Sequence, residues 1–400
     1  MIRAHKIRIF PNREQETGLK KACGCARKAW NWALGRWEET YKAGGKPSAY
    51  GLKKELNSIK EEQFPWMYES TKCAPDQAIL NLGKAYQNFF KGLKAKRKVG
   101  KPKFKSKKSA KDSFYLCNTV KRVKDGRLFV PNISGGIGMS EEVRFQGKIM
   151  SYTVSRDVDR WYVSVLVETE VEELPKTGKT VGVDLGIKTL ATMSDGTVID
   201  NPHLLKRQMR KLARKQRELS RKQKGSKNRE KARIKVAKIH RTVRLARLDV
   251  LHQATTKLVR SYDTIVIEDL NVKGMLKNHK LARSISDCGF GMFRTMLENK
   301  CKMYGKTLVI ADRFFPSSKT CSKCGNKKDQ LSLSERTYQC ELCGFEMDRD
   351  LNAAINLEKY ALVVQNLKPV ELASDLGKTK QRAMKQELTT NDCKKSLIER

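Results

Sequence analysis

Long apolar runs are absent from this chain of 400 residues. No stretch approaches the roughly 18 apolar residues that a membrane-spanning helix needs, so we expect no membrane span. The opening MIRAHK lacks the apolar core of a secretory signal, and we expect a cytoplasmic protein. Acids are also scarce, with 43 Asp and Glu against 83 Lys and Arg, a formal net charge of +40. This excess predicts a polyanionic partner, above all nucleic acid, with a membrane surface as the weaker alternative.

Cysteine is the residue whose spacing is most informative. Cys321 and Cys324 form one Cys-x-x-Cys pair, and Cys340 and Cys343 form a second after fifteen intervening residues. This spacing predicts a structural Zn²⁺ site with four thiolate ligands and a closed shell. A redox Cys-x-x-Cys is the alternative, but two matched pairs exceed that need. The long Lys-rich chain without a signal predicts a reducing surrounding. The other cysteines are therefore expected to be free thiols: Cys23, Cys25, Cys73, Cys117, Cys288, Cys301 and Cys393.

Hydrophobic periodicity divides the chain into a helical block and two regions with strands. Residues 2–10 alternate as a strand, and residues 14–93 repeat apolar side chains at helical spacing. Residues 113–170 read as short strands separated by turns, so we expect them to pair with the first strand and the helical block to be an insertion. Buried strands are predicted at 181–188, 264–268 and 307–311. The intervening residues 203–260 predict long helix with a break near Gly225–Ser226.

These patterns predict a multidomain protein that combines α/β parts with an all-α part. The predicted boundaries are 1–12 with 113–177 for a β module, 13–112 for a helical lobe, 178–320 with 346–368 for an α/β domain, 321–345 for an inserted zinc finger, and 369–400 for a flexible tail. The tail is expected because no aromatic residue follows Tyr360.

Two segments concentrate positive charge. Residues 91–111 carry eleven Lys or Arg and no acid, and residues 201–250 carry 19 against three acids. The first segment is either a solvated linker or a loop that follows phosphates, and the overall charge favours the loop. The predicted nucleic-acid contacts are Lys96, Arg97, Lys98, Lys101, Lys103, Lys105, Lys227 and Arg229.

Three acids lie at the edges of apolar segments. Asp184 follows Val181-Gly-Val, Glu268 ends the run Ile265-Val-Ile, and Asp350 precedes a helix rich in Ala and Asn. A buried carboxylate without a partner costs on the order of several kcal/mol, which metal binding or ion pairing offsets. Mg²⁺ prefers carboxylate oxygens, and two such ions about 4 Å apart promote phosphodiester cleavage. We therefore interpret Asp184, Glu268 and Asp350 as a candidate catalytic Mg²⁺ (or Mn²⁺) site.

Each acid also has an ordinary structural explanation. Asp184 could pair with Lys188 or another base, Glu268 could pair with a nearby Arg, and Asp350 could cap its helix. About eighty residues separate neighbouring acids, so spacing alone leaves their convergence open.

Three segments resemble the acidic motifs of a split RuvC nuclease: Val181–Lys188 around Asp184, Ile265–Leu270 around Glu268, and Asp348–Ala354 around Asp350. Their order, with a four-cysteine finger just before the third motif, resembles the transposon-encoded TnpB family. Further matches are Gly225–Arg229, Gly289–Phe293 and Phe315–Cys321. The resemblance covers roughly residues 1–360 and is strongest from 180 to 360.

The resemblance implies an RNase H-like (RuvC) nuclease domain with an inserted zinc finger, a wedge-like β module that resembles a barrel, and a helical recognition lobe. It implies an RNA-guided DNA endonuclease, an ancestral relative of type V CRISPR effectors. The implied partners are a guide RNA derived from the transposon end and double-stranded target DNA beside a short flanking motif. Asp184, Glu268 and Asp350 would be the metal-binding catalytic acids; Asp348 could compete with Asp350, which directly precedes the sequence LNAA.

Other functions are compatible with the same composition. Some relatives have lost the acids and act as guided DNA-binding repressors, although here all three acids are in place. A transposase that joins strands is the second alternative. A ribosomal or RNA-packaging protein would explain the charge and the zinc but leaves the buried acids without a purpose.

Overall fold

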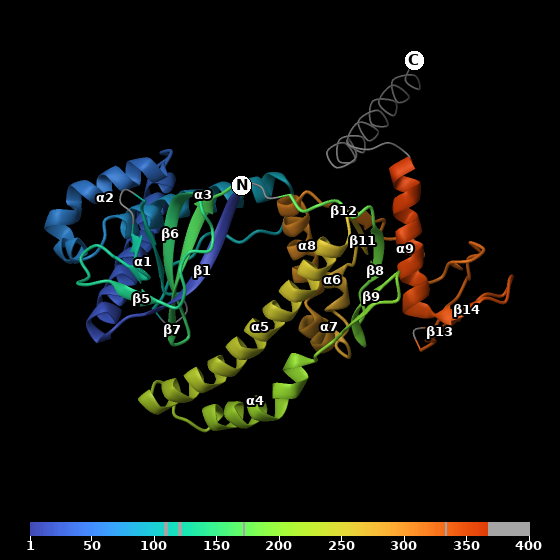
Figure 1. The fold of residues 1–400 in the computed structure, drawn as a ribbon. Helices are drawn as coiled ribbons and strands as arrows, with labels where there is room; N and C mark the ends of the chain where they lie inside the picture. The colour runs from blue at the N-terminus through green and yellow to red at the C-terminus, as the bar shows by residue number, and fades with distance from the viewer. Residues whose placement is uncertain (108–110, 119–121, 171–172, 333, 367–400) are drawn as a thin grey trace, which may run out of the picture. The chain divides into compact units, whose positions relative to one another are not determined.

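The protein is described by a computed structural model that places residues 1–107, 111–118, 122–170, 173–332 and 334–366 (Figure 1). They divide into two compact units, one of Met1–Val171 with Arg217–Lys238 and one of Glu172–Gln216 with Ile239–Arg400. The predicted tail 369–400 lies outside the described residues. No helix in the placed ranges is both long and apolar enough to cross a bilayer.

The first unit begins with a strand and a helical block. Its elements are β1 (Ile2–Phe10), α1 (Arg13–Lys42), α2 (Ala49–Gln63), the 3₁₀ helix η1 (Pro65–Glu69) and α3 (Cys73–Lys94). A capping box starts α1, because the Asn12 side chain accepts from the Gln15 amide and the Gln15 side chain accepts from the Asn12 amide. The helical spacing predicted within residues 14–93 is confirmed in α1, where Ala26, Trp30 and Ala33 are buried and Trp37, further along the same face, is partly buried.

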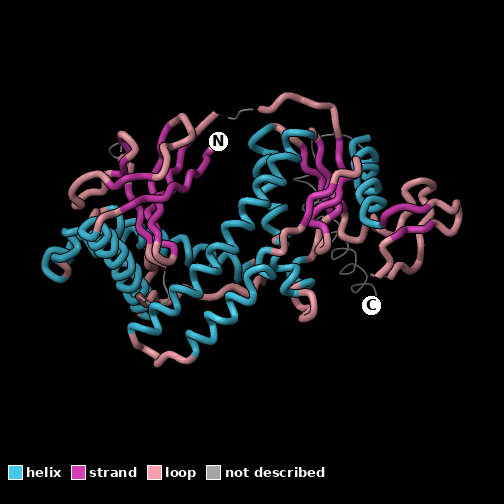
Figure 2. Tube along the Cα trace, turned by 60° about the horizontal axis from the view of Figure 1, so that its bottom comes forward, coloured by secondary structure: helices cyan, strands magenta, loops and turns pink. Residues whose placement is uncertain are grey.

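A seven-stranded antiparallel sheet completes this unit (Figure 2). Its other strands are β2 (Ser113–Leu116), β3 (Val123–Lys124), β4 (Arg127–Leu128), β5 (Ile137–Met139), β6 (Lys148–Asp157) and β7 (Arg160–Glu168). The order is β2-β6-β7-β1-β5-β4-β3, so β1 pairs with strands that follow the helices. This confirms that the helical block is inserted between strands of one sheet. Helix and sheet share one apolar core that includes Leu82, Tyr152 and Val163.

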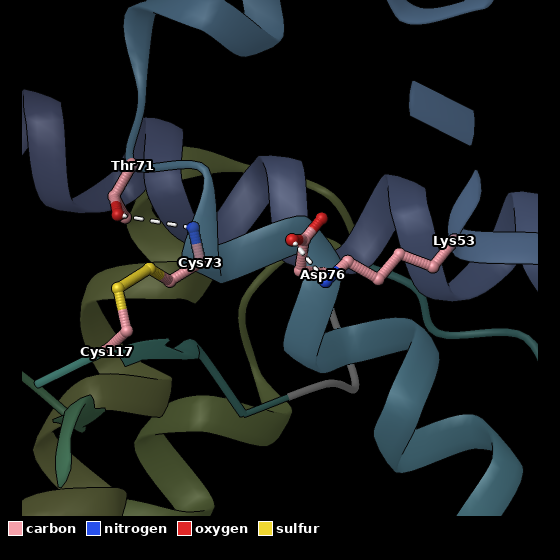
Figure 3. Close-up of a disulfide and its surroundings, with 5 residues drawn as sticks. All are labelled: Lys53, Thr71, Cys73, Asp76 and Cys117. Atoms are coloured by element: carbon pink, nitrogen blue, oxygen red, sulfur yellow. Dashed lines mark hydrogen bonds and ion pairs between the residues drawn. A yellow bond between two sulfur atoms is a disulfide. The ribbon is translucent and has the colours of Figure 1, made fainter. Parts of the chain in front are cut away.

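One expectation about cysteine is wrong. Cys73 at the start of α3 and Cys117 just after β2 form a disulfide, with a Cα–Cα distance of 5.9 Å (Figure 3). The fold brings these residues together across 44 positions of sequence, a proximity that spacing along the chain does not reveal. Four of the scattered cysteines are buried free thiols, as expected: Cys23, Cys25, Cys288 and Cys301. Cys393 lies outside the described residues.

The second unit contains a mixed five-stranded sheet. Its strands are β8 (Thr180–Asp184), β9 (Thr189–Met193), β10 (Val198–Asp200), β11 (Thr264–Glu268) and β12 (Thr307–Ala311), in the order β10-β9-β8-β11-β12. The first three pair antiparallel, whereas β11 runs parallel to both β8 and β12. The strands read as Val- and Ile-rich runs because both faces of the sheet are covered. Ile265 and Ile267 belong to the core formed with Phe293, whereas Val266 packs with Leu357.

The remaining helices are α4 (Leu204–Ser220), α5 (Lys227–Ser261), α6 (Val272–Met275), α7 (Ala282–Cys288), α8 (Phe290–Tyr304) and α9 (Arg349–Asn366). The predicted break between two long helices is confirmed, because α4 ends before Gly225, which has a φ of 88°, and α5 begins after it.

Helix α9 lies directly against the backbone of β8 (Figure 1). Gly182 permits this approach, since a Cβ atom there would lie 1.9 Å from the Ala354 carbonyl oxygen and 2.5 Å from the Glu358 nitrogen. A small antiparallel hairpin, β13 (Thr337–Gln339) with β14 (Glu346–Asp348), runs straight into α9. Helix α9 therefore connects the cysteine-rich hairpin with the central sheet.

Candidate carboxylate and cysteine sites

The fold brings the three predicted acids to one edge of the sheet. Asp184 is the last residue of β8 and Glu268 the last of β11. These strands are parallel neighbours whose register pairs Val183 with Ile267, so both acids lie at the same carboxyl end. Asp350 lies in the first turn of α9, which packs on both strands. Segments far apart in sequence thus deliver one carboxylate each to a common place.

Electrostatics show that these carboxylates interact. Burial, together with the charges of Glu268 and Asp350, raises the pKa of Asp184 to about 8, while Arg349 acts in the opposite direction. A divalent cation would relieve this repulsion, and carboxylate oxygens are the donors that Mg²⁺ and Mn²⁺ prefer. The acids are less tightly grouped than the cysteines: in the placed residues, only the cysteine set has all its ligand atoms within 4.8 Å of one another.

The ion-pair explanations for Asp184 and Glu268 find no support in the described residues. Neither acid forms a salt bridge there, whereas Asp269, the neighbour of Glu268, pairs with Arg294 at 2.6 Å and Arg313 at 2.5 Å. Glu268 instead accepts a hydrogen bond from the hydroxyl of Ser317. Positive charge therefore neutralises the acid beside the candidate site but not Glu268 itself.

Asp348 and Asp350 have different roles at the start of α9. The Asp348 carboxylate accepts from the backbone amides of Asp350 at 3.0 Å and Leu351 at 3.1 Å, so Asp348 caps the helix. Among the residues that the structure places, the Asp350 carboxylate has one ion-pair contact, a long one of 3.4 Å with Arg349. The capping role proposed as the alternative for Asp350 belongs to Asp348, which leaves the Asp350 carboxylate available for a ligand.

The four predicted zinc ligands form a compact cluster. The sulfurs of Cys321 and Cys343 are 3.8 Å apart, and those of Cys324 and Cys340 are 3.6 Å apart. After each pair a glycine with positive φ, Gly325 or Gly344, donates its amide to the carbonyl of the pair's first cysteine, at 3.0 Å in both turns. The two turns are built alike.

The donor set of this cluster fits zinc. The backbone amide of Cys343 helps to lower the pKa of the Cys340 thiol to about 6, whereas hydrogen bonds with the other three cysteines raise the pKa of the Cys324 thiol to about 12, as expected for crowded sulfurs that share their protons. Four sulfurs in this arrangement match a closed tetrahedral shell for Zn²⁺.

Sequence reasoning missed the polar groups that join the two sites. Asn352 and Asn356 are buried in α9, with 0% and 4% of their surface exposed. Asn356 donates to the carbonyls of Ser317 and Thr320, and Asn352 donates to Thr320 and accepts from the amide of Ser322. Two asparagines four residues apart among alanines were the available signal, because a buried amide needs partners.

The predicted nucleic-acid contacts are largely on the surface. Six of them are exposed in the segment after α3: Lys96, Arg97, Lys98, Lys101, Lys103 and Lys105. Lys227, the first residue of α5, is exposed too. Lys101 pairs with Glu38 at 2.9 Å. Arg229 has a structural contact, since its guanidinium donates to the carbonyls of Leu219 and Lys222 in the turn between α4 and α5.

The basic segment after α3 is held on α1. Trp30 donates its indole N–H to the Lys103 carbonyl at 3.0 Å, and Asn31 exchanges two hydrogen bonds with the backbone of Lys105. The Lys105 ammonium lies 3.5 Å from the centre of the Trp30 ring. These contacts argue against a free linker; binding of phosphates stays a prediction.

Three family profiles match the chain. OrfB_IS605, described as "Probable transposase", matches residues 162–279. A "Cas12f1-like, TNB domain" matches residues 290–357, a range that contains the cysteine cluster, and a "Helix-turn-helix domain" of the OrfB_IS605 group matches residues 1–46.

Similar proteins span nearly the whole chain. A "Putative RNA-guided DNA endonuclease" of Streptomyces pristinaespiralis is 38% identical over 360 residues, which cover 89% of this chain and 88% of the relative. "Putative RNA-guided DNA endonuclease InsQ" of Escherichia coli (strain K12) is 31% identical over 377 residues, covering 89% and 91%. Among solved structures, a chain of the "Cas12f1-sgRNA-target DNA complex" aligns with a TM-score of 0.53 at 17% identity, covering 86% of this chain and 83% of that chain. The structural likeness concerns the fold.

Proposed function

The chain belongs to the TnpB family, and on this basis we propose that it is an RNA-guided DNA endonuclease of a transposable element. It would cleave double-stranded DNA beside a short flanking motif, with a guide RNA derived from the transposon end. The observation that carries the proposal is the meeting of Asp184, Glu268 and Asp350 at one sheet edge. A guided repressor without cleavage would have no use for three repelling carboxylates there.

The architecture of the second unit supports an RNase H-like, RuvC-type assignment. Its sheet combines three antiparallel strands with two parallel ones, in the order β10-β9-β8-β11-β12. Asp184 is the last residue of the central strand β8, and Glu268 is the last residue of its parallel neighbour β11. Asp350 lies in the first turn of the helix α9, which packs on both strands. The long alignment with the Cas12f1 chain agrees with this fold. The wedge-like role of the seven-stranded sheet belongs to the same proposal.

We propose that Asp184, Glu268 and Asp350 hold Mg²⁺ or Mn²⁺, and that the four cysteines hold a structural Zn²⁺. When bound, the hard cations supply an activated water and stabilise the leaving oxygen of the phosphodiester. The protein's own contribution is to hold three carboxylates on two strands and one helix, in fixed positions before DNA arrives. The cysteine cluster has a full shell of protein ligands, so its role is structural.

Basic surface would hold the guide and its heteroduplex through phosphates, so that base pairing reads the sequence. The exposed members of the predicted set are Lys96, Arg97, Lys98, Lys101, Lys103, Lys105 and Lys227, of which Lys101 pairs with Glu38 and Lys105 lies over the Trp30 ring. Use of the one carboxylate site proposed within the described residues implies that the two DNA strands are cut in succession.

Asp184→Ala tests the proposal, with Asp200→Ala as a matched control at an exposed strand end of the same sheet. Each protein is purified with its co-expressed RNA, the RNA is sequenced, and a supercoiled plasmid that matches it is supplied with Mg²⁺. We expect wild type and Asp200→Ala to cut, and Asp184→Ala to lose at least about 10³-fold in rate while still binding the guide and target. Cleavage by pure Asp184→Ala would contradict the assignment.

The same assay separates the alternatives. A wild-type protein that binds the RNA-matched plasmid without cutting it would be a guided repressor. Transposon-end DNA joined to the plasmid would instead reveal a strand-transfer enzyme. A heterogeneous mixture of co-purified RNA, in place of one defined species, would indicate a general RNA binder.

A further inference from the structure

We propose that Ser317 is a positioning residue that orients Glu268 for divalent-metal binding, and that helix α9 fixes Ser317 in place. This inference rests on the proposed function, because it assigns a role toward the metal that the carboxylates would hold. It adds a fourth side chain to the site. It also assigns a role there to the loop that leads from Ser317 into Cys321.

The hydrogen bond between Ser317 and Glu268 is the first observation. The Ser317 hydroxyl donates to Oε1 of Glu268, and Ser317 is almost fully buried, with 3% of its surface exposed. Within the described part of the chain, Oε2 of Glu268 has no hydrogen-bond donor. One carboxylate oxygen is therefore anchored while the other is left for a ligand. Anchoring of a metal-binding carboxylate in this way fixes its orientation before the metal binds.

The position of Ser317 is itself fixed by α9. Asn356 donates to the Ser317 carbonyl at 2.8 Å and to the Thr320 carbonyl at 2.7 Å. Asn352 donates to Thr320 at 2.8 Å and accepts from the amide of Ser322 at 2.9 Å. Since Asn352 and Asn356 are buried, breaking these bonds would leave buried polar groups without partners, which disfavours movement of the loop away from α9.

Helix α9 thus acts on two of the three acids. It carries Asp350 in its first turn, and through its asparagines it holds the loop whose serine contacts Glu268. The same loop continues into Cys321, the first ligand of the cysteine cluster. The arrangement keeps Glu268 and Asp350 in one fixed relation without a direct contact between them.

Manganese binding tests the role of Ser317 independently of cleavage. Full-length, zinc-loaded protein free of nucleic acid is titrated with Mn²⁺, and bound ion is measured by electron paramagnetic resonance. The Mn²⁺ that wild type binds and Asp184→Ala does not is assigned to the carboxylate site. The variants are Ser317→Ala, which removes the hydroxyl, and Ser317→Thr, which keeps it. Ser318→Ala is the matched control, because this partly exposed neighbour has no hydrogen bond to the site.

We expect Ser317→Ala to weaken Mn²⁺ binding about 10-fold, within the range for groups that orient metal ligands, and Ser317→Thr to restore most of it. Cleavage by Ser317→Ala should need about 10-fold more metal but approach the wild-type rate at saturation. Zinc content and circular dichroism should match wild type. If Ser317→Ala is too unstable to titrate, Ser317→Cys, with its weak donor, should give an intermediate affinity.

Two failures are distinguishable. Wild-type protein that binds no more Mn²⁺ than Asp184→Ala would overturn the metal site and the proposed function with it. Wild type that binds and cuts, together with a Ser317→Ala or Ser317→Cys affinity equal to that of wild type, would overturn the role of Ser317 alone.

Discussion

The cysteine cluster and the carboxylate cluster belong to the same unit but are built in opposite ways. All four cysteines come from one short segment, and two turns of the same design fold them around a common centre. The carboxylates come from β8, β11 and α9, and they meet only when the sheet and the helix have assembled. The first cluster depends on local geometry and the second on tertiary packing.

The two clusters also differ in how their charge is balanced. Four thiolates would share one ion within a closed shell, so their repulsion is relieved inside the protein. The carboxylates keep their repulsion, which adds to the larger effect of burial in raising the pKa of Asp184 to about 8. Carboxylates whose repulsion persists until a ligand binds are typical of a functional site, whereas a ligand set whose charge is balanced within its own shell is typical of a structural site.

Cys340→Ser should have the largest effect, because it breaks the closed shell. Structural zinc in small modules contributes on the order of 10 kcal/mol to their folding. We expect zinc, measured by mass spectrometry of metals, to fall from one ion per chain to near zero. Cleavage should fall about 100-fold through loss of order near Asp350.

Cys301→Ala is the matched control for Cys340→Ser, since Cys301 is a buried free thiol in the same unit. It should keep its zinc and its activity. A Cys340→Ser protein with full zinc would show that the cluster is not the ligand set.

Gly182→Ala should break the carboxylate cluster while sparing the cysteine cluster. The added Cβ would clash with the backbone of α9 at Ala354 and Glu358. Relief would require the backbone of β8 or of α9 to move, because no flexible side chain lies at the contact. We expect a loss of about 3 kcal/mol in the free energy of unfolding and a loss of cleavage, because α9 carries Asp350.

Thermal denaturation and the cleavage assay measure the effect of Gly182→Ala. Gly291→Ala in α8 is the control: its Cβ would meet nothing within 4 Å, so it should be neutral or slightly stabilising. Equal stability of the two variants would mean that α9 does not pack on β8 as described.

Local chemistry was readable from the sequence, and tertiary proximity was not. The spacing of Cys321, Cys324, Cys340 and Cys343 predicted their cluster, and Asp184 was conspicuous as a charge in an apolar strand. That Asp184, Glu268 and Asp350 converge followed from resemblance to a family, because about eighty residues separate neighbouring acids.

Other features depend on contacts that no local pattern encodes. The Cys73–Cys117 disulfide arises because α3 and β2 are neighbours in space. The hydrogen bond from Ser317 to Glu268 depends on the hydrogen bonds by which α9 holds the loop that contains Ser317. The sequence motif around Ser317 was noticed, but its role could not be assigned without that contact.

Asp184→Asn should stabilise the metal-free protein, and by more as pH rises. The folded pKa of about 8 lies above the unfolded value of 3.8, so the neutral carboxyl's contribution is complete below pH 3.8. It is lost as pH rises toward 8, because the unfolded state ionises this carboxyl freely while the folded state must keep it protonated, and above pH 8 must carry an unfavourable charge. We expect no difference from wild type near pH 4 and a gain of about 1–3 kcal/mol at pH 8.

Chemical denaturation at several pH values, with chelator present, measures the gain from Asp184→Asn. Asp200→Asn, an exposed acid of the same sheet, should show little change at any pH. Adding Mn²⁺ should stabilise wild type but not Asp184→Asn. A gain that is independent of pH would mean that burial and repulsion do not act on Asp184.

Asp269→Asn should have the smallest effect. It tests whether removal of a charge beside the site alters metal binding as removal of a proposed ligand does. Asp269 follows Glu268 directly, yet Arg294 and Arg313 already neutralise it, and these pairs are partly exposed. Such pairs contribute about 0.2–1 kcal/mol, so we expect a small loss of stability and Mn²⁺ affinity within about 2-fold of wild type. Glu268→Gln, one residue earlier, should abolish Mn²⁺ binding at the site. If Asp269→Asn weakens Mn²⁺ binding as much as Glu268→Gln does, Asp269 belongs to the ligand set, and the division between paired and unpaired acids at this sheet edge is wrong.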